Sequence, residues 1–321
     1  MTDIYDRQIK VFGERAQKRL GNSLVLVLGC GALGNLVANN LTRAGVDLRI
    51  VDRDLVESSN LHRTLFRLED EGRSKVEALD EILSKGSISD IEPVFEDFNR
   101  FTWKTITKDV DLIVDCLDSM SSRYLLNEVS VKQEIPFIHG SAIRGEGRIK
   151  FFDGKNECFM CLYPRVPEPG SLETCRGSGV LNYTTSVVSS IQSSMALNYL
   201  ADFGVVNRDL VVVDLKEGRF KTIGVRRKED CDVCQKQKFE IMEGKEDIIV
   251  EETCEGYNVV PKNASVDLKK ISSTYNGNYN ELFTSFAFSG RDIILFENGR
   301  MQVNADNAKE ARSIYSKIVG L

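Results

Sequence analysis

A short apolar run that leads directly into a glycine-rich turn constrains the fold of this chain more than any other feature. Residues 24–28 are continuously apolar, which is typical of a parallel strand buried on both faces. The turn reads Gly29-x-Gly31-x-x-Gly34, and apolar residues then recur at helical spacing. The first glycine permits the tight turn, the second lets backbone N–H groups approach a phosphate, and the third lets the helix pack on the strand. The pattern predicts an α/β sheet that holds a nucleotide.

Strand and helix patterns alternate through the rest of the first half of the chain. Strands are expected at 48–51, 112–116 and 135–138, and helices at 33–43, 74–85 and 122–132. This alternation with short connections predicts a doubly wound, Rossmann-like α/β sheet. Beyond residue 145 the pattern becomes strand-like at 147–152, 210–214 and 219–225, with a helix at 185–203 between them. We therefore expect mixed strands in the second half of the sheet.

The length of 321 residues allows one large domain and a small one. We expect the large domain, with a zinc site, at residues 1–240 and a small α/β domain at 256–321, joined by an acidic linker at 240–255. In the small domain, strands are expected at 285–288, 292–296 and 301–303, with Asn298-Gly299 as a hairpin turn signal. A helix at 307–319 would close this domain.

Charge and composition exclude several classes of protein. The net charge of −6 argues against nucleic acid as the main partner, because phosphate binding usually needs a basic surface. The N-terminus is polar and charged, unlike a signal peptide, and the longest apolar stretch, at 24–34, is too short to span a bilayer. We therefore expect no membrane partner and a cytoplasmic location. In that reducing compartment, the eight cysteines point to metal ligation or catalysis before disulfides.

An acidic residue follows the glycine turn at the spacing of a ribose ligand. Asp52 ends the next expected strand, about 20 residues on, where a carboxylate hydrogen-bonds ribose hydroxyls. The alternative is a glycine turn kept only for close packing, but the strand, helix and acid in register weigh against it. The motif by itself does not distinguish NAD from ATP.

The following segment favours a triphosphate. Asn60 and Arg63, and then Lys75 at the start of a helix, supply more hydrogen-bond donors than a nicotinamide site requires, whereas a triphosphate must be matched by such fixed donors. Asp118 lies just past the carboxyl end of a strand, where ligands bind in open α/β sheets, and its oxygens suit Mg²⁺. Taken singly, each of these charged residues could equally be a solvated surface charge.

Four of the cysteines form two tight pairs, Cys158-x-x-Cys161 and Cys231-x-x-Cys234. Four thiolates fit a tetrahedral zinc site, and a closed set of ligands implies a structural role. A redox pair and an iron–sulfur cluster are the alternatives. Two pairs separated by a whole subdomain suit a clamp, which favours zinc.

Two further residues are candidates for chemistry. Cys175 lies in a glycine-containing loop beside Arg176, and nearby positive charge lowers the pKa of a thiol and favours a nucleophilic thiolate. The alternative is a surface cysteine without a role. His139, one of only two histidines, ends an expected strand and is the one candidate for general acid–base work. A structural histidine near the nucleotide is the alternative.

In this order, the motifs resemble the ubiquitin-activating-enzyme superfamily, and specifically its MoeB/ThiF branch. The matching elements are Tyr5-Asp6-Arg7-Gln8-Ile9, the glycine turn, the run from Asp52 through Asp54 and Asn60 to Arg63, Lys75, Asp115-Cys116-Leu117-Asp118 and the two cysteine pairs. The resemblance covers residues 1 to about 237. It implies an ATP-dependent adenylyltransferase that acts on a ubiquitin-like sulfur-carrier protein ending in Gly-Gly.

The resemblance also implies a role for each matching residue. Arg7 would reach from one subunit into the ATP of its partner, which makes a homodimer a requirement. Asp52 would bind the ribose, and Asp118 would bind Mg²⁺. Cys175 matches a cysteine that takes part in thioester or persulfide chemistry in some members and is dispensable in others. The remaining nucleotide contacts would come from Gly29, Gly31, Gly34, Asp54, Asn60, Arg63 and Lys75.

The reaction implied is attack of the carrier's C-terminal carboxylate on the α-phosphorus of Mg·ATP, which gives an acyl-adenylate and pyrophosphate. Catalysis would then be positioning and charge stabilisation by Arg7, Arg63, Lys75 and the metal. No rhodanese domain is recognisable after the cysteine pairs, so we expect a separate sulfur donor. The small C-terminal domain resembles extensions on some archaeal and bacterial members, and would touch the carrier, brace the dimer or simply add stability.

Three other functions compete with this interpretation. A nicotinamide oxidoreductase explains the glycine turn and Asp52 but leaves Arg7, Lys75 and the cysteine pairs without a purpose. A non-catalytic subunit that presents a carrier protein would not need the full set of charged residues. Adenylation of a tRNA base, as in the related dehydratases, is weakened by the net negative charge.

Overall fold

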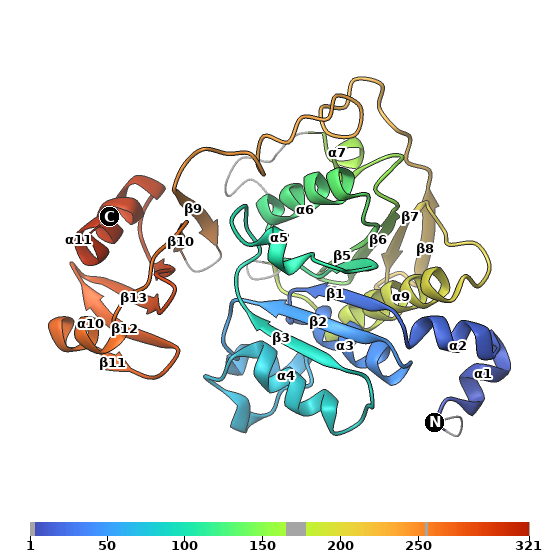
Figure 1. The fold of residues 1–321 in the computed structure, drawn as a ribbon, viewed down its shortest axis with the longest axis horizontal. Coiled ribbons are helices and arrows are strands. Elements are labelled where there is room, and N and C mark those ends of the chain that lie inside the picture. The colour runs from blue at the N-terminus through green and yellow to red at the C-terminus, as the bar shows by residue number, and fades with distance from the viewer. Residues whose placement is uncertain (1–3, 165–177, 254–255, 321) are drawn as a thin grey trace. The chain divides into compact units, whose positions relative to one another are not determined.

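Residues 4–164, 178–253 and 256–320 are described by the computed structural model (Figure 1). They divide into two units, the first ending at Glu243 and the second beginning at Gly244, and each is described by itself. Cys175 and Cys254 lie outside the described residues. Within the described ranges, no helix combines the length and the apolarity that crossing a bilayer demands.

The first unit is built on an eight-stranded mixed sheet in the order β3-β2-β1-β4-β5-β6-β7-β8. The first five strands along the chain are parallel, and β6, β7 and β8 add to the β5 side as antiparallel strands. This confirms the predicted Rossmann-like sheet with a mixed second half. The strands are β1 (Leu24–Leu28), β2 (Asp47–Asp52), β3 (Ile91–Phe95), β4 (Leu112–Asp115), β5 (Phe137–Ile143), β6 (Glu146–Phe152), β7 (Leu210–Asp214) and β8 (Arg219–Ile223).

Helices cover both faces of this sheet. Alternate residues of β1 point to two separate cores: Val25 and Val27 to one, and Leu26 and Leu28 to the other. The first core is shared with α3, α4 and α9, and the second with α5, α6 and α7, on the opposite side of the sheet (Figure 1). Burial on both faces explains why β1 is continuously apolar. The helices are α1 (Asp6–Phe12), α2 (Glu14–Leu20), α3 (Gly34–Arg43), α4 (Lys75–Ser84), α5 (Trp103–Ile106), α6 (Met120–Gln133), α7 (Phe159–Leu162) and α9 (Asn182–Ala201), with 3₁₀ turns η1 (Ser58–Arg63) and η2 (Leu68–Asp70).

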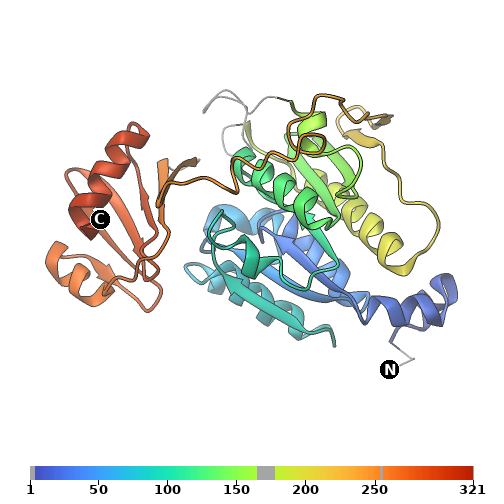
Figure 2. The ribbon, with the colours of Figure 1, turned by 45° about the horizontal axis from the view of Figure 1, so that its top comes forward.

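The second unit is a six-stranded antiparallel sheet in the order β11-β12-β13-β14-β10-β9. Its two helices lie on the same face of this sheet and share one apolar core with it (Figure 2). The predicted small α/β fold of the C-terminal region is therefore confirmed. The elements are β9 (Ile248–Thr253), β10 (Gly256–Pro261), α10 (Leu268–Tyr275), β11 (Asn278–Tyr279), β12 (Phe283–Phe288), β13 (Arg291–Phe296), β14 (Met301–Val303) and α11 (Ala308–Val319).

Several sequence expectations differ from the structure. The stretch 240–255 is not simply a linker, because β9 within it pairs with β10 and belongs to the second sheet. Strand β3 was not expected, since it lies at the sheet edge and contains Pro93, so neither apolar alternation nor strand propensity marks it. Strand β5 continues to Ile143, which places His139 inside the strand rather than at its end.

Candidate functional site

Two of the three glycines of the turn pack against other backbone, and the third faces open space. Gly29 has a φ of +91°, and a Cβ there would lie 2.6 Å from the carbonyl oxygen of Cys116. A Cβ on Gly34 would lie 1.8 Å from the carbonyl oxygen of Gly29, so only glycine lets α3 start this close to β1. Gly31 has no atom within 4 Å of the corresponding position. The turn therefore leaves its backbone approachable at Gly31, at the N-terminus of α3, which is the geometry that accommodates a phosphate.

Asp52 joins the glycine turn to the loop after β2. Its Oδ2 accepts a hydrogen bond from the Cys30 N–H at 2.6 Å, and its Oδ1 accepts one from the Asp54 N–H at 2.8 Å. Burial raises the pKa of the Asp52 carboxyl above its ordinary value, and the nearby positive charge of Lys75 opposes that rise. Each carboxylate oxygen retains a further lone pair, so these contacts leave room for a ribose hydroxyl.

Lys75 lies among three carboxylates. Its Nζ is 3.1 Å from Asp54 Oδ2, and its side chain is 12% exposed. Burial lowers the pKa of Lys75, but Asp54, Asp52 and Asp118 outweigh that effect and the net pKa is raised, so the ammonium stays charged. We call Asp52, Asp54, Lys75 and Asp118 the nucleotide-edge cluster. Its carboxylates lie at or just after the carboxyl ends of β2 and β4, on either side of β1, where open α/β sheets bind ligands. Lys75, the first residue of α4, reaches Asp54 from that helix.

Asn60 and Arg63 lie in the 3₁₀ turn η1 of the same loop. Arg63 Nη1 donates to the Ser59 carbonyl at 2.7 Å, and Asn60 Oδ1 accepts from the Glu57 N–H at 3.2 Å. The structure therefore holds both side chains within their own turn. The segment after η1 is tied to the glycine helix, because Asn35 Oδ1 of α3 accepts from the Leu65 N–H at 2.8 Å. Sequence reasoning did not single out Asn35, since an asparagine at that point of a helix carries no distinctive signal.

Arg7 is far from the cluster of its own chain. Its side chain is 96% exposed, and its ion pair, 3.9 Å long, is with neighbouring Asp6. The helix α1 is attached at the amino end of β2: Gln8 Nε2 donates to the Ala44 carbonyl at 2.9 Å, and Tyr5 packs against Gly45. Strand β2 has six residues and spans roughly 17 Å at about 3.3 Å per residue, with Asp52 at its other end. The structure therefore does not bring Arg7 to the cluster within one chain.

A buried ionic network lies beside the cluster. His139 Nδ1 is 2.7 Å from Asp115 Oδ2, and Arg123 Nε is 3.3 Å from the same oxygen. Burial raises the pKa of Asp115, but Arg123 and His139 reverse the effect and the net pKa is lowered. Burial lowers the pKa of His139. The ring is therefore neutral and donates its Nδ1 proton to an ionised carboxylate, with a side chain only 1% exposed.

The four paired cysteines come together at one point between α7 and the segment after β8. Their sulfur atoms all lie within 4.8 Å of one another, and all four residues are buried. Individual Sγ–Sγ distances are 3.9 Å for Cys158–Cys161, 3.6 Å for Cys158–Cys231 and 3.5 Å for Cys161–Cys234. Tetrahedral zinc with bonds of about 2.3 Å spaces sulfurs about 3.8 Å apart. The set fits zinc, whereas a redox pair needs only two thiols and an iron–sulfur cluster must space its sulfurs around several iron ions.

One of these thiols is already favoured as a thiolate. The hydrogen bond from the Cys158 thiol, with help from backbone N–H groups, lowers the pKa of Cys161, and the same hydrogen bond raises the pKa of Cys158. One of those groups is the Lys228 N–H, which lies 3.4 Å from Cys161 Sγ. Zinc binds the deprotonated form of cysteine, so this environment suits a metal ligand.

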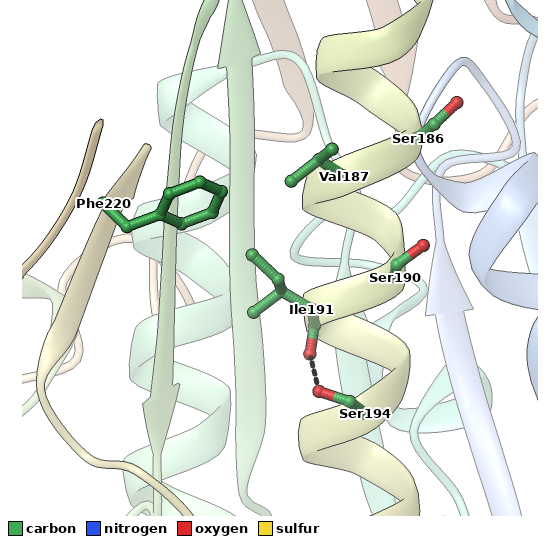
Figure 3. A pocket seen from close by; sticks show the side chains of 6 residues that line it. All are labelled: Ser186, Val187, Ser190, Ile191, Ser194 and Phe220. Atoms are coloured by element: carbon green, nitrogen blue, oxygen red, sulfur yellow. Dashed lines mark hydrogen bonds between the residues drawn. The ribbon is translucent and has the colours of Figure 1, made fainter. Parts of the chain in front are cut away.

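A shallow hollow of about 340 Å³ lies elsewhere, between α9 and the edge strand β8 (Figure 3). The Phe220 ring of β8 turns toward Val187 and Ile191 of α9, and Ser186, Ser190 and Ser194 complete the lining. Among the described residues, none that lines this hollow carries a charged side chain, so these residues offer nothing to neutralise a phosphate or bind a metal. The nucleotide-edge cluster remains the better candidate for chemistry.

Comparison with known proteins finds matches over most of the first unit. The model of the ThiF family matches residues 5–233. The protein named adenylyltransferase and sulfurtransferase MOCS3 of Caenorhabditis briggsae is 34% identical over 241 residues, which cover 72% of this chain and 60% of that protein. The SAMP-activating enzyme E1 of Haloferax volcanii is 34% identical over 239 residues, which cover 72% of this chain and 88% of that protein. The chain thus spans less than two thirds of the length of the MOCS3 relative.

Solved structures share the fold at lower identity. The E. coli MccB structure with MccA-N7isoASN superimposes with a TM-score of 0.65 at 20% identity, covering 73% of this chain and 75% of that one. The structure of PaaA gives a TM-score of 0.61 at 19% identity, covering 70% and 73% respectively. At these identities the likeness shows the common fold alone.

Proposed function

The chain belongs to the ThiF family, and from this premise we propose that it adenylates the C-terminal glycine of a ubiquitin-like sulfur-carrier protein with ATP. The observation that carries the proposal is the nucleotide-edge cluster, which gathers Lys75 and three carboxylates beside an open glycine turn. The names of two relatives, an adenylyltransferase and sulfurtransferase and a SAMP-activating enzyme E1, support the same activity.

The nucleotide would lie across the carboxyl ends of β1, β2 and β4. Its phosphates would meet the backbone at Gly31, with Gly29 and Gly34 shaping the turn, and the ribose would hydrogen-bond Asp52. Lys75, Asn60 and Arg63 would supply donors to the phosphates, and Asp54 would keep the Lys75 ammonium in place at 3.1 Å. Asp118 would bind Mg²⁺, which neutralises phosphate charge.

The reaction is a displacement at the α-phosphorus. An oxygen of the carrier's terminal carboxylate forms a bond to that phosphorus, and the bond to the pyrophosphate oxygen breaks, which leaves an acyl-adenylate. No side chain needs to form a covalent bond in this step, so catalysis is positioning and charge stabilisation. A separate protein would then supply sulfur to the activated carboxyl, and Cys175 is a candidate thiol for that later transfer.

A homodimer would complete the site. Arg7 is exposed and lies at the edge of the sheet opposite the cluster of its own chain, so we propose that it reaches the phosphates bound by a partner subunit. The cysteine centre would hold structural zinc, since four ligands leave no open position. We place the reaction in the cytoplasm, where reduced thiols remain free to bind the metal.

The test is ATP–pyrophosphate exchange with Mg²⁺ and carrier proteins ending in Gly-Gly. We expect exchange that requires a carrier and falls by about 10²–10³-fold in Asp118→Ala and in Lys75→Met, because each removes charge matched to the phosphates or metal. Lys85→Met is the matched control, since Lys85 follows the same helix but is 61% exposed and pairs with Glu81. No exchange with any carrier, in protein that binds ATP and zinc, would overturn the proposal.

A further inference from the structure

The buried network of Asp115, Arg123 and His139 has no part in the reaction just proposed. Two ionisable side chains, Arg123 and His139, meet at the Asp115 carboxylate, and Asp115 is 0% exposed. Burying charged groups is costly unless they are paired and hydrogen-bonded, and the hydrogen bonds of this network reach the backbone around Leu117.

The network fixes the peptides on both sides of Leu117. Asp115 Oδ1 accepts from the Leu117 N–H at 3.0 Å, and Arg123 Nη2 donates to the Leu117 carbonyl. The same Arg123 nitrogen donates to the Gly140 carbonyl at 3.1 Å, which ties the bend formed by residues 115–118 to β5. Leu117 is thus held at its amide and at its carbonyl, and Asp118 is the next residue.

This bend lies directly against the glycine turn. The Cys116 carbonyl is so close to Gly29 that a Cβ there would approach it to 2.6 Å. On the other side, Gln192 of α9 donates to the Asp115 carbonyl at 3.0 Å. Residues 115–118 are therefore held between the glycine turn and α9, and a small rotation of Leu117 would move Asp118 relative to the turn.

His139 fixes the orientation of the central carboxylate. Its Nδ1 makes the shorter contact to Asp115 Oδ2, at 2.7 Å against 3.3 Å for Arg123. The imidazole is itself held by aromatic rings, with centroid distances of 5.1 Å to Phe159 and 6.4 Å to Tyr163. Without His139, the carboxylate would be free to turn toward Arg123 and to release the Leu117 N–H.

We propose that His139 is a positioning residue that holds Asp115, and through it the 115–118 bend, so that Asp118 faces the nucleotide. The inference rests on the proposed function of Asp118. It assigns His139 no proton transfer, because the ring is buried and its Nδ1 proton is already donated to Asp115. It predicts that a side chain with a donor at the Nδ1 position will substitute for histidine.

The experiment compares Mg·ATP binding by calorimetry across a Mg²⁺ titration. His139→Leu removes the donor at similar volume, and His139→Asn keeps an amide donor close to the place of Nδ1. Loss of groups that orient a metal ligand weakens metal binding by about 10–100-fold, which we expect for His139→Leu, with His139→Asn within about threefold of the native protein. Val46→Ala is the control, since it removes buried volume at the amino end of β2, opposite the cluster.

The outcomes separate the positioning role from the proposed function. A native protein that binds no Mg·ATP would remove the proposed function itself. Native binding with an unchanged Mg²⁺ dependence in His139→Leu would overturn the positioning role alone. Equal weakening in His139→Leu and Val46→Ala, or no recovery in His139→Asn, would also overturn it, because general loss of stability would then account for the effect.

Discussion

At the scale of single residues, pairing and burial decide which charges persist at this site. Lys75 stays protonated because three carboxylates outweigh its burial. His139 is neutral because burial outweighs one carboxylate. Both side chains are largely buried beside carboxylates, yet Lys75 is charged and His139 is neutral. The sequence around either residue does not reveal this difference, because it depends on the tertiary surroundings.

His139 should make the stability of the first unit depend on pH. Its pKa is lowered by burial, so below about pH 6.5 the unfolded chain takes up a proton that the folded ring refuses. Native stability then falls on acidification by up to about 1.4 kcal/mol per pH unit, whereas His139→Asn has no such titration. The advantage of the native protein over His139→Asn should therefore shrink between pH 7.5 and pH 5.5.

Urea unfolding followed by fluorescence would measure this difference. The single tryptophan, Trp103, is buried in the core of the first unit and reports its unfolding. Both proteins carry the same cysteine ligands, so acid release of zinc cancels in the comparison. A difference in unfolding free energy that stays constant with pH would show that His139 titrates normally.

At the scale of elements, the sequence predicted many strands and helices that have a regular apolar pattern and missed several short elements. Strand β1 and the glycine turn were predictable because burial on both faces leaves a continuous apolar run. The edge strand β3 and the helix α10 were not expected, although Asp267 caps α10 by accepting from the Lys270 N–H at 3.0 Å. Asp52 and Asp118 were identified from their positions at the ends of strands, and Lys75 from its place at the start of a helix. Their arrangement around Lys75 depends on tertiary packing.

Helix α6 connects both cysteine-bearing segments to the bend that carries Asp118. The buried Asn127 Oδ1 accepts from the Phe159 N–H at 2.7 Å, between Cys158 and Cys161. Glu128 accepts from the backbone N–H of Met242 at 2.8 Å, beyond the second cysteine pair. Helix α6, which begins two residues after Asp118, thus forms hydrogen bonds to the chain at both cysteine-bearing segments.

Asn127→Leu should weaken zinc binding. The substitution leaves the buried Phe159 N–H without an acceptor, which costs about 1–3 kcal/mol. If relaxation displaces the first cysteine pair, this cost corresponds to a loss of zinc affinity of about 5- to 160-fold. Transfer of zinc to a colorimetric chelator measures the effect, and Asn127→Asp, which keeps the acceptor oxygen, is the matched variant. Equal zinc retention in the native protein and Asn127→Leu would show that the cysteines hold the metal without help from α6.

At the scale of the whole molecule, the sequence predicts a site that a single chain does not assemble. Arg7 lies within the residues that match the ThiF family, yet in the structure it lies at the edge of the sheet away from Asp52. A residue that is matched by sequence but remote within its own chain is the pattern expected when two subunits share a site. The small C-terminal unit has its own core.

Subunit mixing would decide whether Arg7 acts across a dimer. Arg7→Ala and Asp118→Ala should each abolish most carrier-dependent exchange as separate proteins. If Arg7 serves the partner's site, a mixed dimer contains one site with both residues intact, and random mixing of equal amounts restores about a quarter of native exchange. If Arg7 acts within its own chain, every site in the mixed dimer lacks one residue. Exchange measured after co-expression of the two variants would then stay at the level of the separate proteins, and the shared site would be ruled out.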